Sequence, residues 1–288
     1  MSKTTIYTQI PGELQRHAQQ HDYGEVYQRE CINSWREAGL NVVSINPDSE
    51  VELWKAKGID VEVVSNGTAN SRTRIGDFLS RISASGDDIA GIINADCFLI
   101  NLGSAINAAL SAAQNSLVLL ERLGIDPDTM RPTALYSGGF DGFIFDTRFL
   151  PRVRDADAWT IGSPQWDYWF PLVMHIAGAR LKKPDALLLM HLDHPRKWNQ
   201  EEYLGNALKL WHALESLNLD SLPKEVATEA RSFKPSSEGG EAAVERFLNS
   251  VASWLIESRE PFPVCPAGAP GDFLRRILAG FETQMTFG

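Results

Sequence analysis

The sequence predicts an α/β fold in which helices cover both faces of a mostly parallel, Rossmann-like sheet. Short β-branched and aliphatic runs alternate with stretches of helical periodicity over the first two thirds of the 288 residues. Strands joined by helices of this length form right-handed crossovers, which place the helices against the sheet. The fractions of apolar residues (43%) and charged residues (22%) are those of an ordinary globular protein.

The predicted elements follow one another from the N-terminus. Residues 4–8 are expected to form a short strand, and a helix is expected over 24–38, where Val26, Ile32 and Trp35 recur at helical spacing. Gly39 ends that helix, and a β-branched run predicts the second strand over 41–45. The next elements are a helix over 48–58, a strand over 61–64, a helix over 75–84, a strand over 89–94 and a helix over 105–113.

Beyond residue 123 the regular alternation of short strands and helices ends. Glycines bracket alternating aromatic residues over 138–146, helices are predicted over 166–178 and 201–217, and an apolar strand lies between them at 186–191. Residues 219–240 are rich in Ser, Gly, Pro and charged side chains, as linkers are. The chain is therefore expected to comprise a main domain over 1–218, a linker over 219–240 and a helical C-terminal appendage over 241–288.

Charge and apolar runs limit the partners and the location. A formal net charge of −10 disfavours nucleic acid and anionic membrane surfaces as partners. No apolar run approaches the roughly 18 residues that cross a bilayer, and the first 12 residues lack the apolar core of a secretory signal. Cys31, Cys97 and Cys265 are too few and too widely spaced for a disulfide framework or a cysteine zinc site. We expect a cytoplasmic protein without a membrane span.

Polar residues follow several predicted strands. Open parallel sheets bind ligands outside the carboxyl ends of their strands. This rule puts Asp96, which interrupts the apolar run GIINADCFLI, at a strand end facing a crevice rather than in the core. The same rim contains residues 8–11, 46–48 and 66–74.

A second polar group, His191-Leu192-Asp193-His194, closes the last predicted strand. Alternation in a strand puts His191 and Asp193 on one face, as two ligands or as a hydrogen-bonded pair. Structural explanations stand beside the functional ones. Asp96 can cap a turn, Asp167 can stabilise the first turn of its helix, and His191 can be a buried structural histidine.

Motifs of several enzyme classes are absent from the sequence. It contains no Gly-x-Gly-x-x-Gly after the first strand, no Gly-x-x-x-x-Gly-Lys, no His-Glu-x-x-His and no Gly-x-Ser-x-Gly. The sequence therefore disfavours dinucleotide dehydrogenases, P-loop enzymes, zinc proteases of that type and α/β-hydrolases.

The order of the remaining motifs resembles the GT-A type of nucleotide-diphospho-sugar glycosyltransferases over roughly residues 4–212. Residues 29–35 look like the first helix of such domains. Asn94-Ala95-Asp96 is similar to their Asp-x-Asp metal motif, with Asn94 in place of the first acid. Asp167 is similar to the acid that faces the acceptor, and His191 lies where many members supply a metal ligand.

This resemblance implies an enzyme that moves a sugar from a nucleoside-diphosphate sugar to an unknown acceptor. Asp96 and His191 would hold Mn²⁺ or Mg²⁺, with the imidazole favouring Mn²⁺. Asp167 would be the catalytic base or acceptor-positioning residue, and Asp141 and Trp166 would contact the sugar or acceptor. The expected nucleotide- and diphosphate-binding residues are Thr8, Asn46, Arg72, Arg74, Asn94 and Asp96.

Two other functions stay open. A sugar nucleotidyltransferase is disfavoured because the first strand lacks a Gly-rich loop bearing Lys or Arg. A non-catalytic nucleotide-sugar-binding module with a degenerate metal motif is compatible with Asn94, since the motif then supplies a single carboxylate.

Overall fold

An eight-stranded sheet forms the centre of the protein in a computed structural model. The structure describes residues 4–18, 21–100, 103–135, 139–195, 198–217, 220, 222–233 and 240–264. The strand order is β14-β12-β8-β11-β6-β1-β4-β5. In chain order these strands are β1 (Thr5–Thr8), β4 (Asn41–Asn46), β5 (Glu62–Ser65), β6 (Ile89–Ile93), β8 (Ser116–Leu120), β11 (Gly142–Asp146), β12 (Arg180–Pro184) and β14 (Glu260–Phe262).

The sheet is parallel except at β11, which runs antiparallel to β6 and β8. This confirms the predicted mostly parallel α/β fold. Tyr7 lies opposite Val43 on one side and Ile92 on the other, so β1 is central. The carboxyl ends of β1, β4 and β6 therefore meet at one edge of the sheet, where ligands bind in such folds.

Helices cover both faces of the sheet. They are α1 (Gly24–Glu37), α2 (Asp48–Lys57), α3 (Ile75–Ser85), α4 (Gly103–Ala112) and α5 (Trp166–Ile176). Alternate residues of β8 belong to different cores: Leu117 and Leu119 pack with α3 and α5, whereas Val118 and Leu120 pack with α1 and α4. Both faces of the strand are therefore buried, as expected for parallel sheets.

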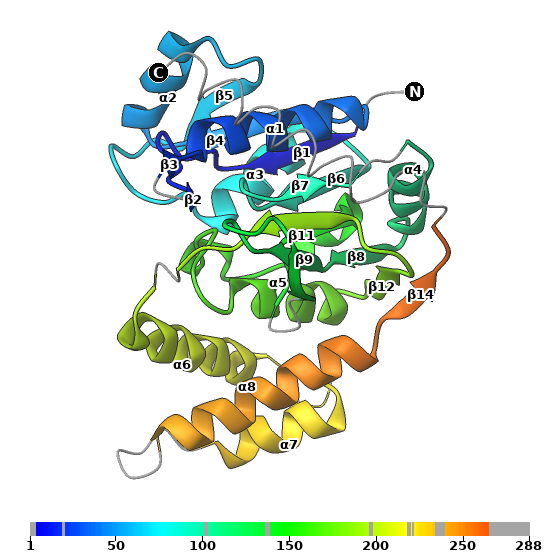
Figure 1. Cartoon of the computed structure of the whole chain (residues 1–288). Helices are drawn as coiled ribbons and strands as arrows, with labels where there is room; N and C mark the ends of the chain where they lie inside the picture. The colour runs from blue at the N-terminus through cyan, green and yellow to red at the C-terminus, as the bar shows by residue number, and fades with distance from the viewer. Residues whose placement is uncertain are drawn as a thin grey trace.

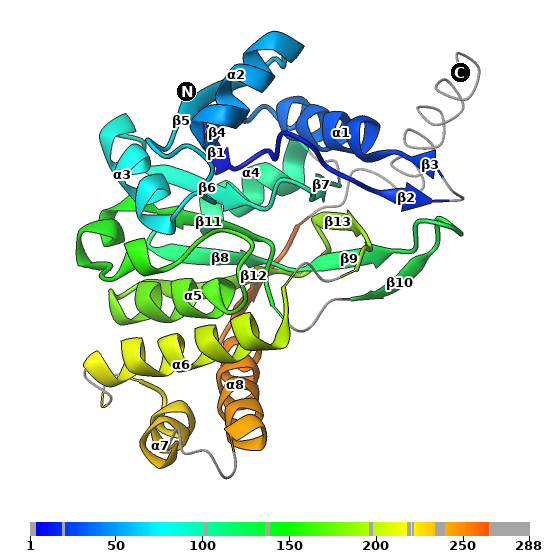
Figure 2. The same cartoon turned by 90° about the vertical axis from the view of Figure 1, so that its left-hand side faces the viewer.

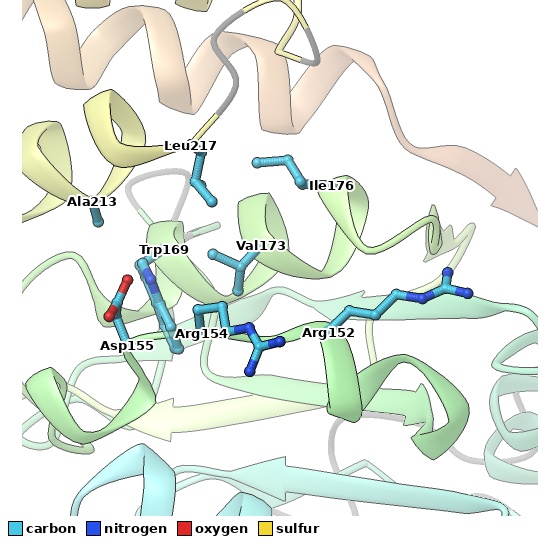
Figure 3. A pocket seen from close by; sticks show the side chains of 8 residues that line it. All are labelled: Arg152, Arg154, Asp155, Trp169, Val173, Ile176, Ala213 and Leu217. Atoms are coloured by element: carbon cyan, nitrogen blue, oxygen red, sulfur yellow. The ribbon is translucent and has the colours of Figure 1, made fainter.

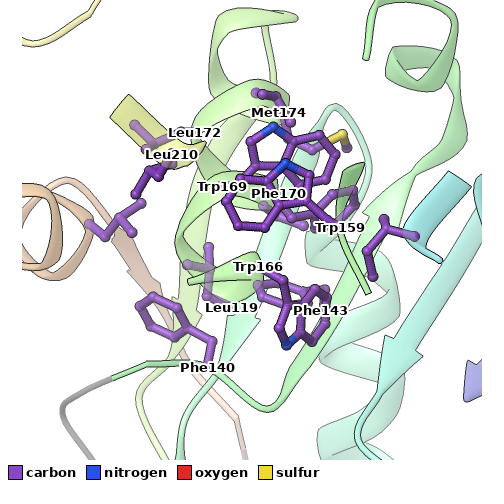
Figure 4. Close-up of a cluster of buried hydrophobic side chains, with 14 of the residues drawn as sticks. Leu119, Phe140, Phe143, Trp159, Trp166, Trp169, Phe170, Leu172, Met174 and Leu210 are labelled. Atoms are coloured by element: carbon purple, nitrogen blue, oxygen red, sulfur yellow. The ribbon is translucent and has the colours of Figure 1, made fainter. Parts of the chain in front are cut away.

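Aromatic side chains fill the core beneath α5 (Figure 4). Phe143 of β11 packs edge-on against Trp166 and Phe170, with ring centroids 5.2 and 5.3 Å apart. Trp159 stacks on Trp169 at 5.6 Å. These contacts fix the start of α5 against the centre of the sheet, and Asp167 lies in that first turn.

A smaller, four-stranded sheet lies at one end of the main sheet (Figure 2). Its order is β10 (Pro132–Leu135), β9 (Arg122–Ile125), β13 (Leu189–Leu192) and β7 (Phe98–Leu99). The short strands β2 (His17–Ala18) and β3 (His21–Asp22) form a separate hairpin. Two 3₁₀ helices, η1 (Thr147–Arg152) and η2 (Ala156–Ala158), precede α5.

Three helices form a further layer on the side of α5 away from the sheet (Figure 1). They are α6 (Gln200–Ser216), α7 (Lys224–Ser232) and α8 (Gly240–Glu257). α7 lies inside the segment 219–240 that was expected to be a linker. It is tied to α6 because the Trp211 Nε1–H donates to the Ala230 carbonyl oxygen at 2.7 Å. The division of the chain at 218 and 240 stays a prediction.

The described C-terminal residues return to the main sheet after α8. β14 pairs in parallel with the edge strand β12, with Glu260 opposite Lys182. Just before β14, buried Arg259 forms an ion pair with Glu121 at 2.8 Å and lies over the ring of Phe140 at 5.2 Å. The expected helical appendage thus contributes a strand as well. Its residues 265–288, with Cys265, lie outside the described ranges.

The element boundaries agree closely with the sequence-based ones, with a few exceptions. The final predicted strand over 186–191 begins only at Leu189. The strands β2, β3, β7, β8, β9, β10, β12 and β14 went unpredicted, and Gly138 lies outside the described residues. No helix in the described ranges combines the length and the apolar character needed to cross a bilayer.

Candidate metal centre and acid cluster

Side chains of α1 hold the segment that follows β6. The Tyr27 hydroxyl donates to the Asp96 carbonyl oxygen at 2.7 Å and accepts from the Leu192 N–H at 2.9 Å. Gln28 Nε2 and Trp35 Nε1 donate to the carbonyl oxygens of Ala95 and Cys97 at 2.8 and 3.0 Å. α1 therefore supplies the hydrogen bonds that a strand neighbour would otherwise give to this backbone.

Strand pairing then brings the two halves of the site together. β7 pairs antiparallel with β13, and Phe98 lies opposite Met190. His191 follows in β13 and Asp96 precedes β7 by two residues. His191 Nε2 lies 3.3 Å from Asp96 Oδ2 although 95 residues separate them in sequence. The expected proximity of these two side chains is observed.

His194 completes a cluster with them. Its Nε2 lies 3.5 Å from the same oxygen, Asp96 Oδ2. One ligand atom from each of Asp96, His191 and His194 lies within 4.8 Å of the others. Arg16 Nη2 also forms an ion pair with Asp96 Oδ2. His191 is buried, but the Asp96 and His194 side chains are each 21% exposed, so the cluster is accessible from one side.

The contacts of Nδ1 in His194 and His191 bear on whether Nε2 of each ring carries a proton or a lone pair. His194 Nδ1 lies 2.7 Å from the Pro195 carbonyl oxygen, which can only accept, so Nδ1 carries the proton. A neutral His194 then turns the lone pair of Nε2 towards Asp96. His191 Nδ1 lies 3.7 Å from Asp193 Oδ1, beyond hydrogen-bond distance, and has no hydrogen-bond partner among the described residues. A ring without a proton on Nε2 can offer that lone pair to a cation at Asp96, whereas a ring protonated there donates to the carboxylate.

The Asp193 carboxylate lies beside His191 and is itself held by a hydrogen bond. Thr133 Oγ1 donates to Asp193 Oδ2 at 2.7 Å. Gly124 lies opposite His191 in β9, and a Cβ there would come within 2.4 Å of Thr133 Oγ1 and 2.7 Å of Asp193 Oδ1. A carboxylate behind a histidine orients the ring and raises its basicity towards a metal.

The electrostatics keep Asp96 ionised. Burial raises the pKa of Asp96, but His191, His194 and Arg16 outweigh it and hold the pKa well below its usual range. Burial lowers the pKa of His191, whereas Asp96 and Asp193 raise it to a net value above the usual one. One carboxylate oxygen and two imidazole nitrogens are a donor set that suits Mn²⁺ better than Mg²⁺. The residues present fit a divalent ion of that kind.

Asn94 and Asp141 form a second group beside this cluster. The Asn94 Nδ2 donates to Asp141 Oδ1 at 2.6 Å, and its backbone N–H donates to the Asp141 carbonyl oxygen at 2.8 Å. Arg122 Nη1 donates to the same carboxylate oxygen at 3.0 Å. Asp141 is buried. An acid at position 94 would face this carboxylate with like charge, which explains physically why the first residue of the motif is Asn.

Asp167 lies near this group at the start of α5. Its Oδ2 accepts from the Phe140 N–H at 3.0 Å. Burial raises the pKa of Asp167 to about 7, and the charge of Asp141 acts in the same direction, while the Phe140 N–H and Arg122 oppose the shift. A carboxyl group with this pKa can gain or lose a proton near neutral pH, as general bases do.

The remaining predicted ligand residues have the following surroundings. Thr8 is fully buried, and its Oγ1 has no hydrogen-bond partner in the described part of the chain. Asn46 is buried and donates to the Ile10 carbonyl oxygen at 2.6 Å and to Glu50 Oε2 at 2.7 Å, so it shapes the loop after β1. Arg72 pairs with Glu202 at 3.3 Å, and Arg74 Nε lies 3.6 Å from Asp77 Oδ2. Their ligand roles stay predictions.

Two further points concern predicted and unpredicted residues. Trp166 is 2% exposed and packs in the core, and its expected acceptor contact stays a prediction. Arg16, Tyr27 and Arg122 were not expected at the site. His194 was noticed in its motif but was given no role. Arg16 stands in a polar stretch without a recognisable motif, so the sequence carries no signal for it.

A surface hollow lies between η1, α5 and α6 (Figure 3). Arg152, Arg154 and Asp155 line it together with apolar side chains. None of its lining residues is a predicted site residue. The chemistry indicated by the sequence is therefore centred on Asp96 and Asp167 and not on this hollow.

Comparisons with known proteins identify the fold. No protein-family model and no curated protein matches the chain. The structure of S. aureus TarS residues 1–349 with UDP-GlcNAc matches with a TM-score of 0.52 and 11% identity, over 90% of this chain and 82% of that one. A second structure of that fragment matches with a TM-score of 0.50 and 11% identity, over 100% of this chain and 92% of that one.

A mannosyltransferase from Pyrobaculum calidifontis in complex with GDP-Man and Mn²⁺ is also similar, at a TM-score of 0.45 and 13% identity, over 99% of this chain and 76% of that one. A score below 0.5 adds no weight to the argument. The TarS structures and the sheet topology show that the chain has a GT-A-type glycosyltransferase fold. At 11% identity this likeness establishes the fold and leaves the reaction open.

Replacing Tyr27 tests the role of α1. Tyr27→Phe leaves the Leu192 N–H and the Asp96 carbonyl oxygen without their hydroxyl partner. We expect the free energy of unfolding to fall by about 2–4 kcal/mol in urea titrations, because the Leu192 N–H is buried and the Asp96 carbonyl oxygen is partly buried. Glu52→Gln, in an exposed pair with Lys55 on α2, is the control and should change stability by less than about 0.5 kcal/mol. An equal loss in both variants would contradict the role of α1.

The raised pKa of Asp167 predicts a pH-dependent cost to stability. The unfolded chain loses this proton near its ordinary pKa, and the folded chain loses it only near 7, so the contribution of Asp167 becomes less favourable as pH rises from about 4 to about 7. Between pH 5 and 8 the wild type should lose roughly 2–3 kcal/mol more unfolding free energy than Asp167→Asn. Urea titrations at the two pH values measure this difference. Asp60→Asn, an exposed control, should behave like the wild type.

Proposed function

We propose that this protein is an enzyme that transfers a sugar from a nucleoside-diphosphate sugar to an acceptor, with a divalent cation bound by Asp96, His191 and His194. The observation that carries the proposal is the convergence of these three side chains, with ligand atoms within 4.8 Å, next to the end of β6 in a GT-A-type fold. Donors of this class carry a diphosphate leaving group, whose charge must be neutralised as it departs.

The residues around the cation would each have a defined task. Asp96 provides the anionic ligand, and His191 and His194 present their Nε2 lone pairs. Asp193 and Thr133 keep the ring of His191 in position. A bound Mn²⁺ would act as a Lewis acid on the leaving phosphate oxygens. Asn94 is assigned to hold Asp141 and not to the ion, because its amide donates to that carboxylate.

Asp167 would be the general base for the acceptor hydroxyl. Its pKa of about 7 makes it basic enough to take a proton while a useful fraction is ionised at neutral pH. Phe140 orients the carboxyl through its N–H. Asp141 and Arg122 set the charge beside it, and Asp141 would contact the sugar.

The two alternative functions, nucleotidyl transfer and binding without catalysis, predict different experimental results. A sugar nucleotidyltransferase would release pyrophosphate from a nucleoside triphosphate and a sugar phosphate. A binding module would bind nucleotide sugars without turnover. Because the TarS fragment is in complex with UDP-GlcNAc, we propose UDP-GlcNAc as the first donor to test, with slow donor hydrolysis as the sign of a transferase.

Replacing a histidine tests the metal site without removing the ion pair of Asp96 with Arg16. His194→Gln should weaken Mn²⁺ binding at least about tenfold, since one of three protein ligands is lost. Isothermal titration calorimetry with Mn²⁺, followed by titration with the donor, measures both affinities. Asp96→Asn should lose Mn²⁺ binding and Mn²⁺-dependent donor binding altogether. Asp60→Asn is the exposed control, and unchanged affinities in both site variants would refute the proposed site.

The rate of donor hydrolysis should depend on the ionisation of Asp167. We expect kcat/KM to rise with pH up to about 7 and then to level off, because the base must be deprotonated. Asp167→Asn should lower kcat/KM by about 10²–10⁴-fold and abolish that rise, while Mn²⁺ affinity stays unchanged. A pH profile in the variant that still rises through 7 would assign the base to another group.

A further inference from the structure

Arg16 is the buried residue at the site for which the sequence gives no explanation. Its side chain is 2% exposed, and its Nη2 forms an ion pair with Asp96 Oδ2. The Nη1 donates to the Gln15 carbonyl oxygen at 2.8 Å, and the Nε has no hydrogen-bond partner among the described residues. A buried guanidinium N–H without a partner lowers the free energy of unfolding. Arg16 is therefore expected to serve a purpose other than stability.

The backbone of Arg16 is fixed from both sides. The Asp22 carboxylate accepts from the Arg16 N–H at 2.8 Å, and the Tyr23 N–H donates to the Arg16 carbonyl oxygen at 2.7 Å. The side chain is held by two hydrogen bonds, one to Asp96 and one to Gln15. The backbone is thus held independently of the contact between the guanidinium and Asp96.

The Arg16 guanidinium binds the same oxygen, Asp96 Oδ2, that the proposed cation would bind. Asp96 Oδ2 is the oxygen that faces His191 Nε2, His194 Nε2 and Arg16 Nη2. Ions of the Mn²⁺ and Zn²⁺ type bind carboxylate oxygen at about 2.0–2.2 Å, and a guanidinium N–H at hydrogen-bond distance from the same oxygen would face such an ion with like charge. Arginine cannot lose its proton to relieve this repulsion.

We infer that Arg16 is the resident counter-ion of Asp96 and competes with the divalent cation for Asp96 Oδ2, so that Arg16 sets how tightly this site binds metal. The inference rests on the proposed metal site. In the metal-free protein the guanidinium neutralises Asp96, and metal binding requires that this ion pair open. The single carboxylate of the motif makes the competition strong, because Asn94 adds no negative charge that would favour the divalent ion over Arg16.

Mn²⁺ binding to the full-length protein tests the competition directly. Electron paramagnetic resonance of free Mn²⁺ measures the affinity without any turnover. Arg16→Gln removes the competing charge and keeps much of the side-chain volume, so the Kd for Mn²⁺ should fall at least about tenfold. Arg16→Lys keeps a cation but not the planar fork, so its Kd should lie between those of the wild type and Arg16→Gln. Arg29→Gln, in an exposed pair with Glu25, should leave the Kd unchanged.

Thermal unfolding of each variant separates folding from binding, and Arg16→Lys retains the test if Arg16→Gln does not fold. If Arg16→Gln binds Mn²⁺ as the wild type does, or more weakly, while His194→Gln loses binding, then the competition is refuted and the metal site stands. If neither the wild type nor the two Arg16 variants binds Mn²⁺, the proposed metal site fails and this inference fails with it.

Discussion

The candidate site depends on a set of hydrogen bonds from one helix to a segment of irregular backbone. Residues 95–97 lie between β6 and the short strand β7, where their carbonyl oxygens have no neighbouring strand to bind. Tyr27, Gln28 and Trp35 of α1 replace those partners, and the Ser34 hydroxyl accepts from the Leu99 N–H at 2.9 Å. Because buried backbone groups must be paired, this helix fixes where Asp96 points. The tyrosine hydroxyl also binds Leu192, so one side chain aligns both contributors to the metal cluster.

Two acids of the site differ in ionisation because their neighbours differ. Asp96 is surrounded by Arg16, His191 and His194, and cationic or proton-donating neighbours keep its pKa low. Burial dominates at Asp167 and the charge of Asp141 adds to it, so the pKa of Asp167 rises although the Phe140 N–H donates to its carboxylate. Groups whose environments separate their pKa values in this way can serve as a permanent anion and an exchangeable proton site. The proposed division of roles between metal ligand and base follows from this difference.

The sequence predicts the fold well because hydrophobic periodicity and strand-end residues carry most of the signal. It places Asp96 at the end of a strand and connects it with His191 through the order of the elements. β8 is less recognisable: its run SLVLL is buried on both faces and therefore lacks the alternation that identifies a half-exposed strand. The roles of residues that depend on contacts distant in sequence cannot be predicted in this way. The role of Arg16 depends on a hairpin that returns it to the sheet, and the role of Asn94 depends on Asp141, a partner 47 residues away.

The pairing of β14 has a consequence for when the site is completed during synthesis. The strand occupies the edge of the main sheet next to β12, and the Arg259 that precedes it lies over Phe140, whose N–H holds Asp167. A nascent chain that has emerged only as far as α5 has Asp96 and Asp167 but lacks both His191 and this arginine. About nine tenths of the polypeptide must be synthesised before Arg259 can reach Phe140, so the surroundings of Asp167 are completed only late in translation.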